Sequence, residues 1–134
     1  MIRRRILVCS AILGALVGCE DEGPTGREVP TLCEQGVTIT VGTGLTPSFE
    51  WSPVCRVTML QVRDAETDRP VWTLLAGPFN GLTPPVTYGT APPGAITSDP
   101  DEEALAAGTS YILVLRVADI FAGEYEVGRR EFTP

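Results

Sequence analysis

The chain has 134 residues, with 17 acidic side chains, 10 basic ones, no histidine and no lysine, and a net charge of −7. The lack of histidine excludes the Ser/His/Asp and Cys/His nucleophile systems and the histidine-containing metal sites of hydrolases. The lack of lysine excludes lysine-based mechanisms. Because nucleic-acid binding depends on Lys and Arg at phosphates, so acidic a chain is a poor match for nucleic acid. We therefore expect no catalytic residue, no cofactor and no nucleic-acid partner.

The first 18 residues predict a cleaved export signal. Met1–Arg5 is basic, Ile6–Val17 is almost wholly apolar, and the small residue Gly18 precedes Cys19. These are the three regions of a secretory signal peptide. The apolar run has about twelve residues, whereas crossing a bilayer takes about twenty, so a transmembrane helix is the poorer interpretation.

The end of this signal, Leu16-Val17-Gly18-Cys19, resembles the lipobox of bacterial lipoproteins. The resemblance implies that Cys19 becomes the N-terminus and carries a diacylglycerol thioether, usually with a third acyl chain. Two or three chains anchor a protein stably to a membrane. The expected location is the bacterial cell envelope, on the outer membrane if the cell has one, facing the periplasm or the cell surface. The alternative is an ordinary secretory signal followed by an incidental cysteine.

Residues 19–36 predict a flexible acidic tether. The segment is rich in Gly, Pro and acid and holds too little apolar surface to order itself. Loss of residues 1–18 removes three arginines and no acid, so the net charge falls to −10. That charge argues against binding to anionic lipid and leaves the acyl chains as the expected membrane contact. The sequence Glu20-Asp21 after the lipidated cysteine leaves the choice between inner and outer membrane open.

Two cysteines, Cys33 and Cys55, remain after Cys9 leaves with the signal and Cys19 is lipidated. Outside the cytosol such a pair is most simply a structural disulfide, here contributing on the order of 3 kcal/mol. A metal site is less well supported, because the chain offers no histidine or further cysteine as a ligand. A redox pair is also less well supported, because the C-x-x-C spacing of such pairs is absent.

Residues 37–134 read as short strands separated by turn residues. The third strand has an imperfect period, which predicts a bulge or cover on both faces. The sixth has apolar residues on both faces, which predicts an interior position in its sheet. The seven expected strands are Val37–Val41, Pro47–Trp51, Arg56–Asp64, Val71–Leu75, Val86–Tyr88, Ser110–Ala118 and Glu124–Phe132.

The segment Asp99–Leu105 predicts a helix of one or two turns that ends at Gly108. An aspartate followed by proline and further acids is typical of a helix start. The same segment holds the densest acidic cluster, which is either a solvated helix cap or a calcium site. Because the alternating D-x-D-x-D-G pattern is lacking, no metal ligand is assigned. The cluster is Asp99, Asp101, Glu102 and Glu103.

Three segments resemble a fibronectin type III domain: Phe49-x-Trp51, Val71-Trp72, and Leu105-x-x-Gly108-Thr109-x-Tyr111 before a long strand. The resemblance implies an all-β, seven-stranded antiparallel sandwich over about residues 37–132. It places Trp51 in the core and bonds the Tyr111 hydroxyl to nearby backbone. The Cys33–Cys55 bridge and the long proline-rich segment 88–98 depart from that family, so a related immunoglobulin-like sandwich stays open.

Three other aromatic residues, Trp72, Tyr88 and Phe79, have two possible roles. They either pack in the core or share an exposed surface that could stack on a sugar or accept a partner's side chain. The choice separates two functional hypotheses. The first is a non-catalytic, lipid-anchored interaction, adhesion or scaffolding module with an envelope protein or glycan as partner. The alternative is a carbohydrate-binding module or carboxylate-dependent glycosidase accessory domain.

Overall fold

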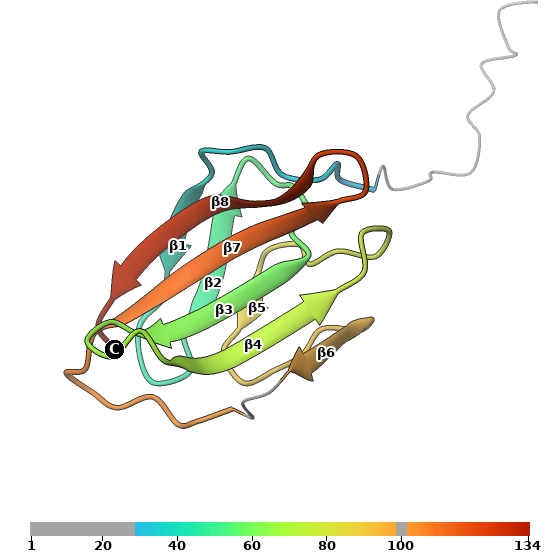
Figure 1. The fold of residues 1–134 in the computed structure, drawn as a ribbon. Coiled ribbons are helices and arrows are strands. Elements are labelled where there is room, and N and C mark those ends of the chain that lie inside the picture. Colours follow the sequence, from blue (N-terminus) through green and yellow to red (C-terminus); the bar gives the residue numbers. More distant parts are fainter. Residues whose placement is uncertain (1–28, 99–101) are drawn as a thin grey trace, which may run out of the picture.

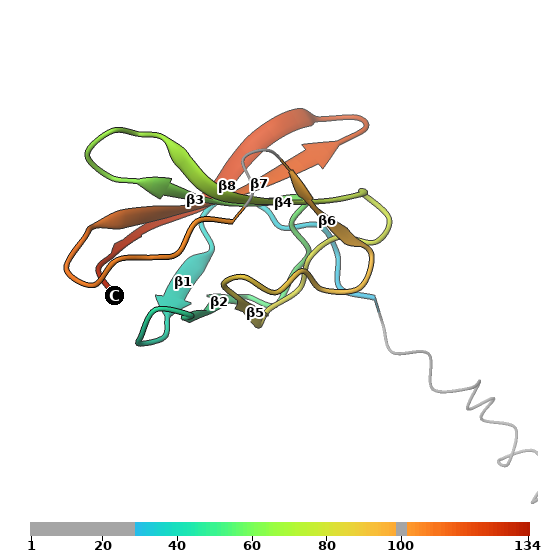
Figure 2. The same cartoon turned by 90° about the horizontal axis from the view of Figure 1, so that it is seen from below.

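Two antiparallel β-sheets lie face to face and enclose one apolar core (Figures 1 and 2). The computed structural model describes residues 29–98 and 102–134. The smaller sheet has the strand order β1-β2-β5 and the larger sheet the order β6-β4-β3-β7-β8. The strands are β1 (Thr38–Val41), β2 (Ser48–Ser52), β3 (Met59–Asp64), β4 (Pro70–Ala76), β5 (Val86–Thr87), β6 (Ala95–Ser98), β7 (Tyr111–Asp119) and β8 (Gly123–Phe132). The predicted all-β class is confirmed for this part of the chain, which holds no helix able to span a membrane.

Two aromatic pairs join the sheets across the core. Phe49 of β2 meets Phe132 of β8 edge to face, with ring centroids 5.6 Å apart. Trp72 of β4 packs on Tyr88, which directly follows β5, at 4.8 Å. Such contacts contribute about 0.5–1.5 kcal/mol beyond the area that they bury. These contacts therefore help to hold the two sheets together.

Two of the three interior strands of the larger sheet, β3 and β7, have the features that the sequence predicted. In β3 the consecutive residues Leu60, Gln61 and Val62 are all buried, so both faces are covered. The pairing of β3 with β4 also shifts register after Val62, which is the expected irregularity. β7 lies between β3 and β8, as its two-sided apolar pattern predicted.

An eighth strand, β6, was not predicted. It pairs with β4 at the edge of the larger sheet, from Thr73↔Ser98 to Ala76↔Ala95. Its one large apolar residue, Ile96, is 65% exposed, so no buried face gives the sequence a period-2 signal. Backbone pairing alone defines this strand, and the described residues therefore contain eight strands and not the expected seven.

The short helix expected at 99–108 is wrong for the part that the structure describes. Residues 102–108 form no helix, and Asp99 to Asp101 lie outside the described residues. Here the backbone bonds across the fold: Glu103 N–H donates to the Val71 carbonyl (3.0 Å) and Ala106 N–H donates to the Tyr111 hydroxyl (2.9 Å). Leu105 is buried in the core. Tertiary hydrogen bonds and one buried leucine outweigh the local helix-start signal.

Candidate functional site

The predicted disulfide ties the start of the domain to the link between β2 and β3. Cys33 and Cys55 are bonded, with Cα atoms 4.9 Å apart, and both are buried. The Cys33 N–H donates to the Arg56 carbonyl, and the Arg56 N–H donates to the Thr31 carbonyl, both at 2.8 Å. Trp51 Nε1–H donates to the Cys55 carbonyl (2.9 Å). Residues 31–36 lie within the range predicted as the tether, and the predicted bridge together with these hydrogen bonds holds them against the sandwich.

Arg56 extends this junction to the loop between β4 and β5. Its guanidinium Nε donates to the Pro30 carbonyl, and its Nη1 donates to the Pro78 and Phe79 carbonyls, both at 2.8 Å. A Cβ on Gly81 would come within 2.7 Å of the Arg56 Cβ, so only glycine fits beside it. One side chain thus holds the first described residues against an exposed loop.

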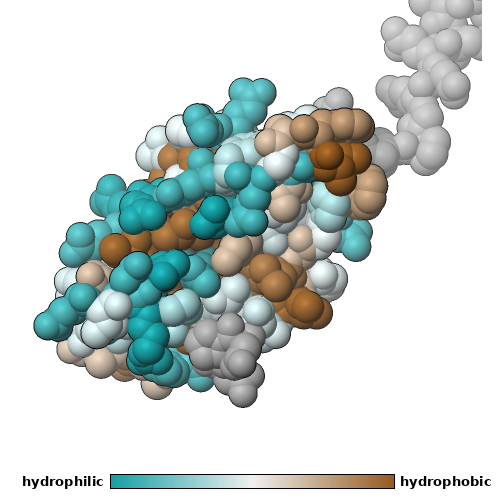
Figure 3. Space-filling view, in the orientation of Figure 1, coloured by the Kyte–Doolittle hydropathy of each residue, from teal (hydrophilic) through white to brown (hydrophobic). Residues whose placement is uncertain are grey.

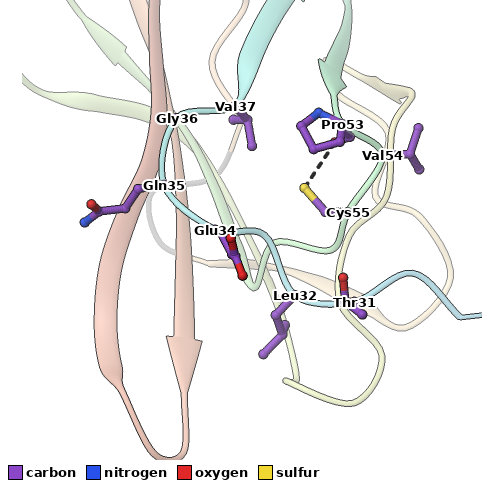
Figure 4. A pocket seen from close by; sticks show the side chains of 9 residues that line it. All are labelled: Thr31, Leu32, Glu34, Gln35, Gly36, Val37, Pro53, Val54 and Cys55. Carbon is purple, nitrogen blue, oxygen red and sulfur yellow. Dashed lines mark hydrogen bonds between the residues drawn. The ribbon is translucent and has the colours of Figure 1, made fainter.

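A hollow of about 310 Å³ lies beside the disulfide, between the incoming chain and the β2–β3 link (Figure 4). Among its lining residues are Leu32, Glu34, Pro53, Val54 and Cys55. Cys55 Sγ is 3.2 Å from the Pro53 carbonyl oxygen. The disulfide sulfur carries no proton, so this is a close contact and not a donated bond. Glu34 is the one ionisable side chain of the lining, so the hollow offers no acid–base pair.

Three further hollows are open grooves on the sheets. The largest, about 600 Å³, runs between β1 and β8 and contains Arg130 and Glu131. A second, near β1 and β2, contains Glu50, and the third contains Arg116 and Glu124, which form an ion pair. In none of these four hollows do two carboxylates meet, so none has the paired acids of a glycosidase.

Two members of the proposed ligand surface, Trp72 and Tyr88, are core residues, 1% and 2% exposed. The Tyr88 hydroxyl donates to the Glu103 carbonyl, and burial, with a smaller contribution from Glu102, raises the pKa of this phenol. Phe79, in contrast, is 80% exposed. The three side chains therefore form no common exposed strip, which corrects that possibility. The Trp72 and Tyr88 rings pack in the apolar core between the two sheets, a placement that the sequence had left open.

The two described members of the acidic cluster, Glu102 and Glu103, have different surroundings. Both Nη atoms of Arg69 bond the Glu103 carboxylate, one at 2.8 Å, and these bonds lower the pKa of Glu103. Glu102 is exposed, while Asp99 and Asp101 lie outside the described residues. Within residues 29–98 and 102–134, no three His, Cys, Asp or Glu side chains could together hold a metal ion.

The tyrosine that begins β7 is placed as the resemblance implied. Tyr111 is 5% exposed, and its hydroxyl accepts the Ala106 N–H at 2.9 Å. A second tyrosine has a similar role at the other edge of the domain, where the Tyr125 hydroxyl donates to the Cys33 carbonyl at 3.0 Å. Both phenols bond backbone and serve the fold.

Exposed apolar side chains in turns are the surface feature that sequence reasoning missed. Ile120 and Phe121 occupy the turn between β7 and β8 and are 70% and 93% exposed. The available signal was the presence of two large apolar residues in the short link between the expected strands Ser110–Ala118 and Glu124–Phe132.

Comparisons with known protein families, with characterised proteins and with solved structures find no match to this chain.

Proposed function

We propose that this protein is a non-catalytic, lipid-anchored component of a bacterial cell envelope, with a fibronectin type III-like or immunoglobulin-like sandwich as its interaction module. The observation that carries the proposal is the Leu16-Val17-Gly18-Cys19 sequence after a basic and apolar leader. Sulfur is the lipid acceptor at such a site, and two or three acyl chains make attachment effectively permanent.

The folded part fits an extracytoplasmic location. A disulfide persists in an oxidising compartment and is rare in the cytosol, and the Cys33–Cys55 bridge is buried at the start of the domain. The fold assignment is supported by the two packed antiparallel sheets and by the Tyr111 hydroxyl bonded to backbone five residues earlier. The eighth strand, β6, is an addition at the edge of the larger sheet.

A role in binding is favoured over a role in catalysis. The sequence lacks histidine and lysine, and the four hollows described above hold no pair of carboxylates. The carbohydrate-binding alternative required an exposed aromatic strip, and Trp72 and Tyr88 are buried. The partner class that remains is an envelope protein or polymer reached from the membrane surface.

The test is the pair of variants Cys19→Ala and Cys9→Ala, expressed in a bacterium that processes lipoproteins. Cys19→Ala is expected to remove the mass of the acyl chains and to shift the chain into soluble or unprocessed fractions. Cys9→Ala lies within the leader and is expected to change neither property. Both variants are compared with the parent by intact mass and by detergent partition. If the Cys19→Ala chain keeps the acyl mass and stays with the membrane, lipid attachment at Cys19 is refuted.

The interaction role has its own test. The full-length protein is crosslinked in living cells, solubilised in detergent and recovered. A reproducible crosslinked protein or cell-wall polymer supports the role, whereas recovery of this protein alone contradicts it. Binding or turnover on a glycan array would favour the carbohydrate alternative.

A further inference from the structure

Exposed apolar side chains gather at one end of the sandwich. Figures 1 and 2 both place three segments at this end: the first described residues (29–31), the β4–β5 loop (77–85) and the β7–β8 turn (120–122). We name it the tether end. The β1–β2 turn, residues 42–47, lies toward the opposite end in both views.

The side chains at the tether end are large and solvent-exposed. Phe79 is 80% exposed, Ile120 is 70% exposed and Phe121 is 93% exposed. Val29 adds a smaller apolar group, 69% exposed. Figure 3 shows hydrophobic atoms gathered where the β7–β8 turn lies. Exposed apolar groups concentrated in this way are typical of protein or membrane contacts.

Local hydrogen bonds hold the two loops in their projecting shapes. The Asp119 carboxylate accepts the N–H groups of Phe121 (2.6 Å) and Ala122 (2.9 Å), which fixes the β7–β8 turn. The β4–β5 loop closes through the Gly81 N–H and the Gly77 carbonyl, 2.8 Å apart. The apolar side chains are therefore carried by turns that are already ordered, so contact with another surface would cost little conformational entropy.

Arg56 connects the Phe79 tip to the incoming chain. Its guanidinium bonds the carbonyls of Pro30, Pro78 and Phe79. Cys19 precedes Pro30 by eleven residues, which span at most about 40 Å. Covalent attachment makes any further contact with the same bilayer intramolecular, so weak apolar contacts suffice to maintain it.

The charged side chains at the tether end indicate whether an anionic or a zwitterionic bilayer would fit this surface. Asp119 lies at the base of the β7–β8 turn, where the backbone N–H groups of Ala122 and Phe121 lower its pKa and keep it ionised. Glu124 follows the turn and is paired with Arg116. Arg56 is occupied by backbone carbonyls. No basic cluster is present among these segments to attract anionic lipid, so a zwitterionic surface fits best.

We propose that the tether end is a second membrane contact, at which Phe79, Ile120 and Phe121 insert into the interfacial zone of the zwitterionic bilayer that holds Cys19. The inference rests on the lipid attachment proposed above. It orients the sandwich with its β1–β2 turn away from the membrane, where a partner can reach it. Apolar side chains at such a boundary sit about 5–10 Å into the headgroup and acyl region.

The experiment places one added tryptophan in each of three full-length, lipidated chains: Phe121→Trp, Phe79→Trp and, as matched control, Leu45→Trp. Leu45 is 49% exposed and lies in the β1–β2 turn. The native Trp51 and Trp72 are buried and supply a constant background. Each chain is reconstituted in phosphatidylcholine vesicles with or without brominated acyl chains, which quench tryptophan inside the bilayer. Intact mass and vesicle flotation are measured on the same samples.

We expect brominated lipid to reduce the added emission at positions 121 and 79 at least about twofold and to leave position 45 unchanged. Equal quenching at all three positions, or none at 121 and 79, overturns the membrane contact. Unquenched tips that become protected from iodide as chain density rises identify a second copy as the occupant and also overturn it. A chain without the acyl mass refutes the lipid attachment itself, whereas a lipidated, floating chain with unquenched tips refutes this inference alone.

Discussion

Replacement of Cys33 and Cys55 by alanine tests how much the disulfide contributes to the stability of the domain. The bridge closes a loop with a sequence separation of 22 residues. Loss of loop-closure entropy in the unfolded chain predicts a stabilisation of about 3 kcal/mol for a loop of this length. Alanine is chosen because serine would bury a hydroxyl in a site where both sulfurs are buried.

The expected change in melting temperature follows from the size of the domain. A domain near one hundred residues shifts by about 5 °C per kcal/mol, so the double variant should melt about 15 °C lower than the parent. It should still fold, because residues 31–36 keep other bonds to the sandwich. The Gly36 N–H donates to the Val127 carbonyl at 2.9 Å, and the Tyr125 hydroxyl donates to the Cys33 carbonyl.

Circular dichroism melts of the parent, the reduced parent and the double variant measure the effect, and hydrogen exchange locates it. The parent under reductant should melt close to the double variant. Faster exchange confined to residues 31–36 with an unchanged melting temperature would refute the reasoning. The bridge would then hold only the incoming segment, and unfolding of the core would not depend on it.

Three further predictions concern a phenol, a glycine and a carboxylate. Tyr111→Phe removes the acceptor of the Ala106 N–H and should cost about 1 kcal/mol, seen as a melt about 5 °C lower; an unchanged melt would contradict the structural role of the hydroxyl. Gly128→Ala would bring a Cβ within 2.6 Å of a Val37 methyl and should cost about 1–3 kcal/mol, whereas Gly77→Ala, with nothing within 4 Å, should be nearly neutral in urea unfolding. The pKa of Asp64 is lowered, chiefly because its carboxylate accepts the Thr67 N–H. The ionised carboxylate therefore stabilises the fold above about pH 4, and this contribution is lost as the pH falls through the lowered pKa of the folded state. Asp64→Asn should therefore flatten the fall in melting temperature between about pH 5 and pH 2, and an identical pH profile would contradict this.

The amino-acid sequence by itself determined the strands whose side chains alternate. The sequence predicted Thr38–Val41 and Ser48–Ser52 to within one residue, because a half-buried strand imposes a period of two on its residues. Tyr111–Asp119 was predicted equally closely, from an alternating run with apolar residues on both faces in its middle. The disulfide was also expected, because Cys33 and Cys55 are the two cysteines left once the predicted signal and the proposed lipid site are set aside, and the structure confirms this bridge. The predicted export signal and the lipobox resemblance at Cys19 also rest on sequence alone; they lie outside the described residues and stay predictions.

The tertiary structure alone decided the rest. β6 exists because the edge of β4 offers backbone partners, and its own residues carry no alternating signal. The segment 102–108 is not helical because Glu103 and Ala106 bond to groups distant in sequence or across a turn. Local preferences of a fraction of a kcal/mol per residue cannot outweigh such contacts.

The placement of aromatic rings shows the same division. Trp72 and Phe79 lie seven residues apart and were both named as possible members of an exposed surface, yet one is 1% exposed and the other 80%. Trp72 is buried because the opposite sheet brings Tyr88 against it. Phe79 is exposed because the loop that carries it turns outward beside Arg56. Composition and period fix which residues can form strands, but only the packing of one sheet on the other decides which rings it covers.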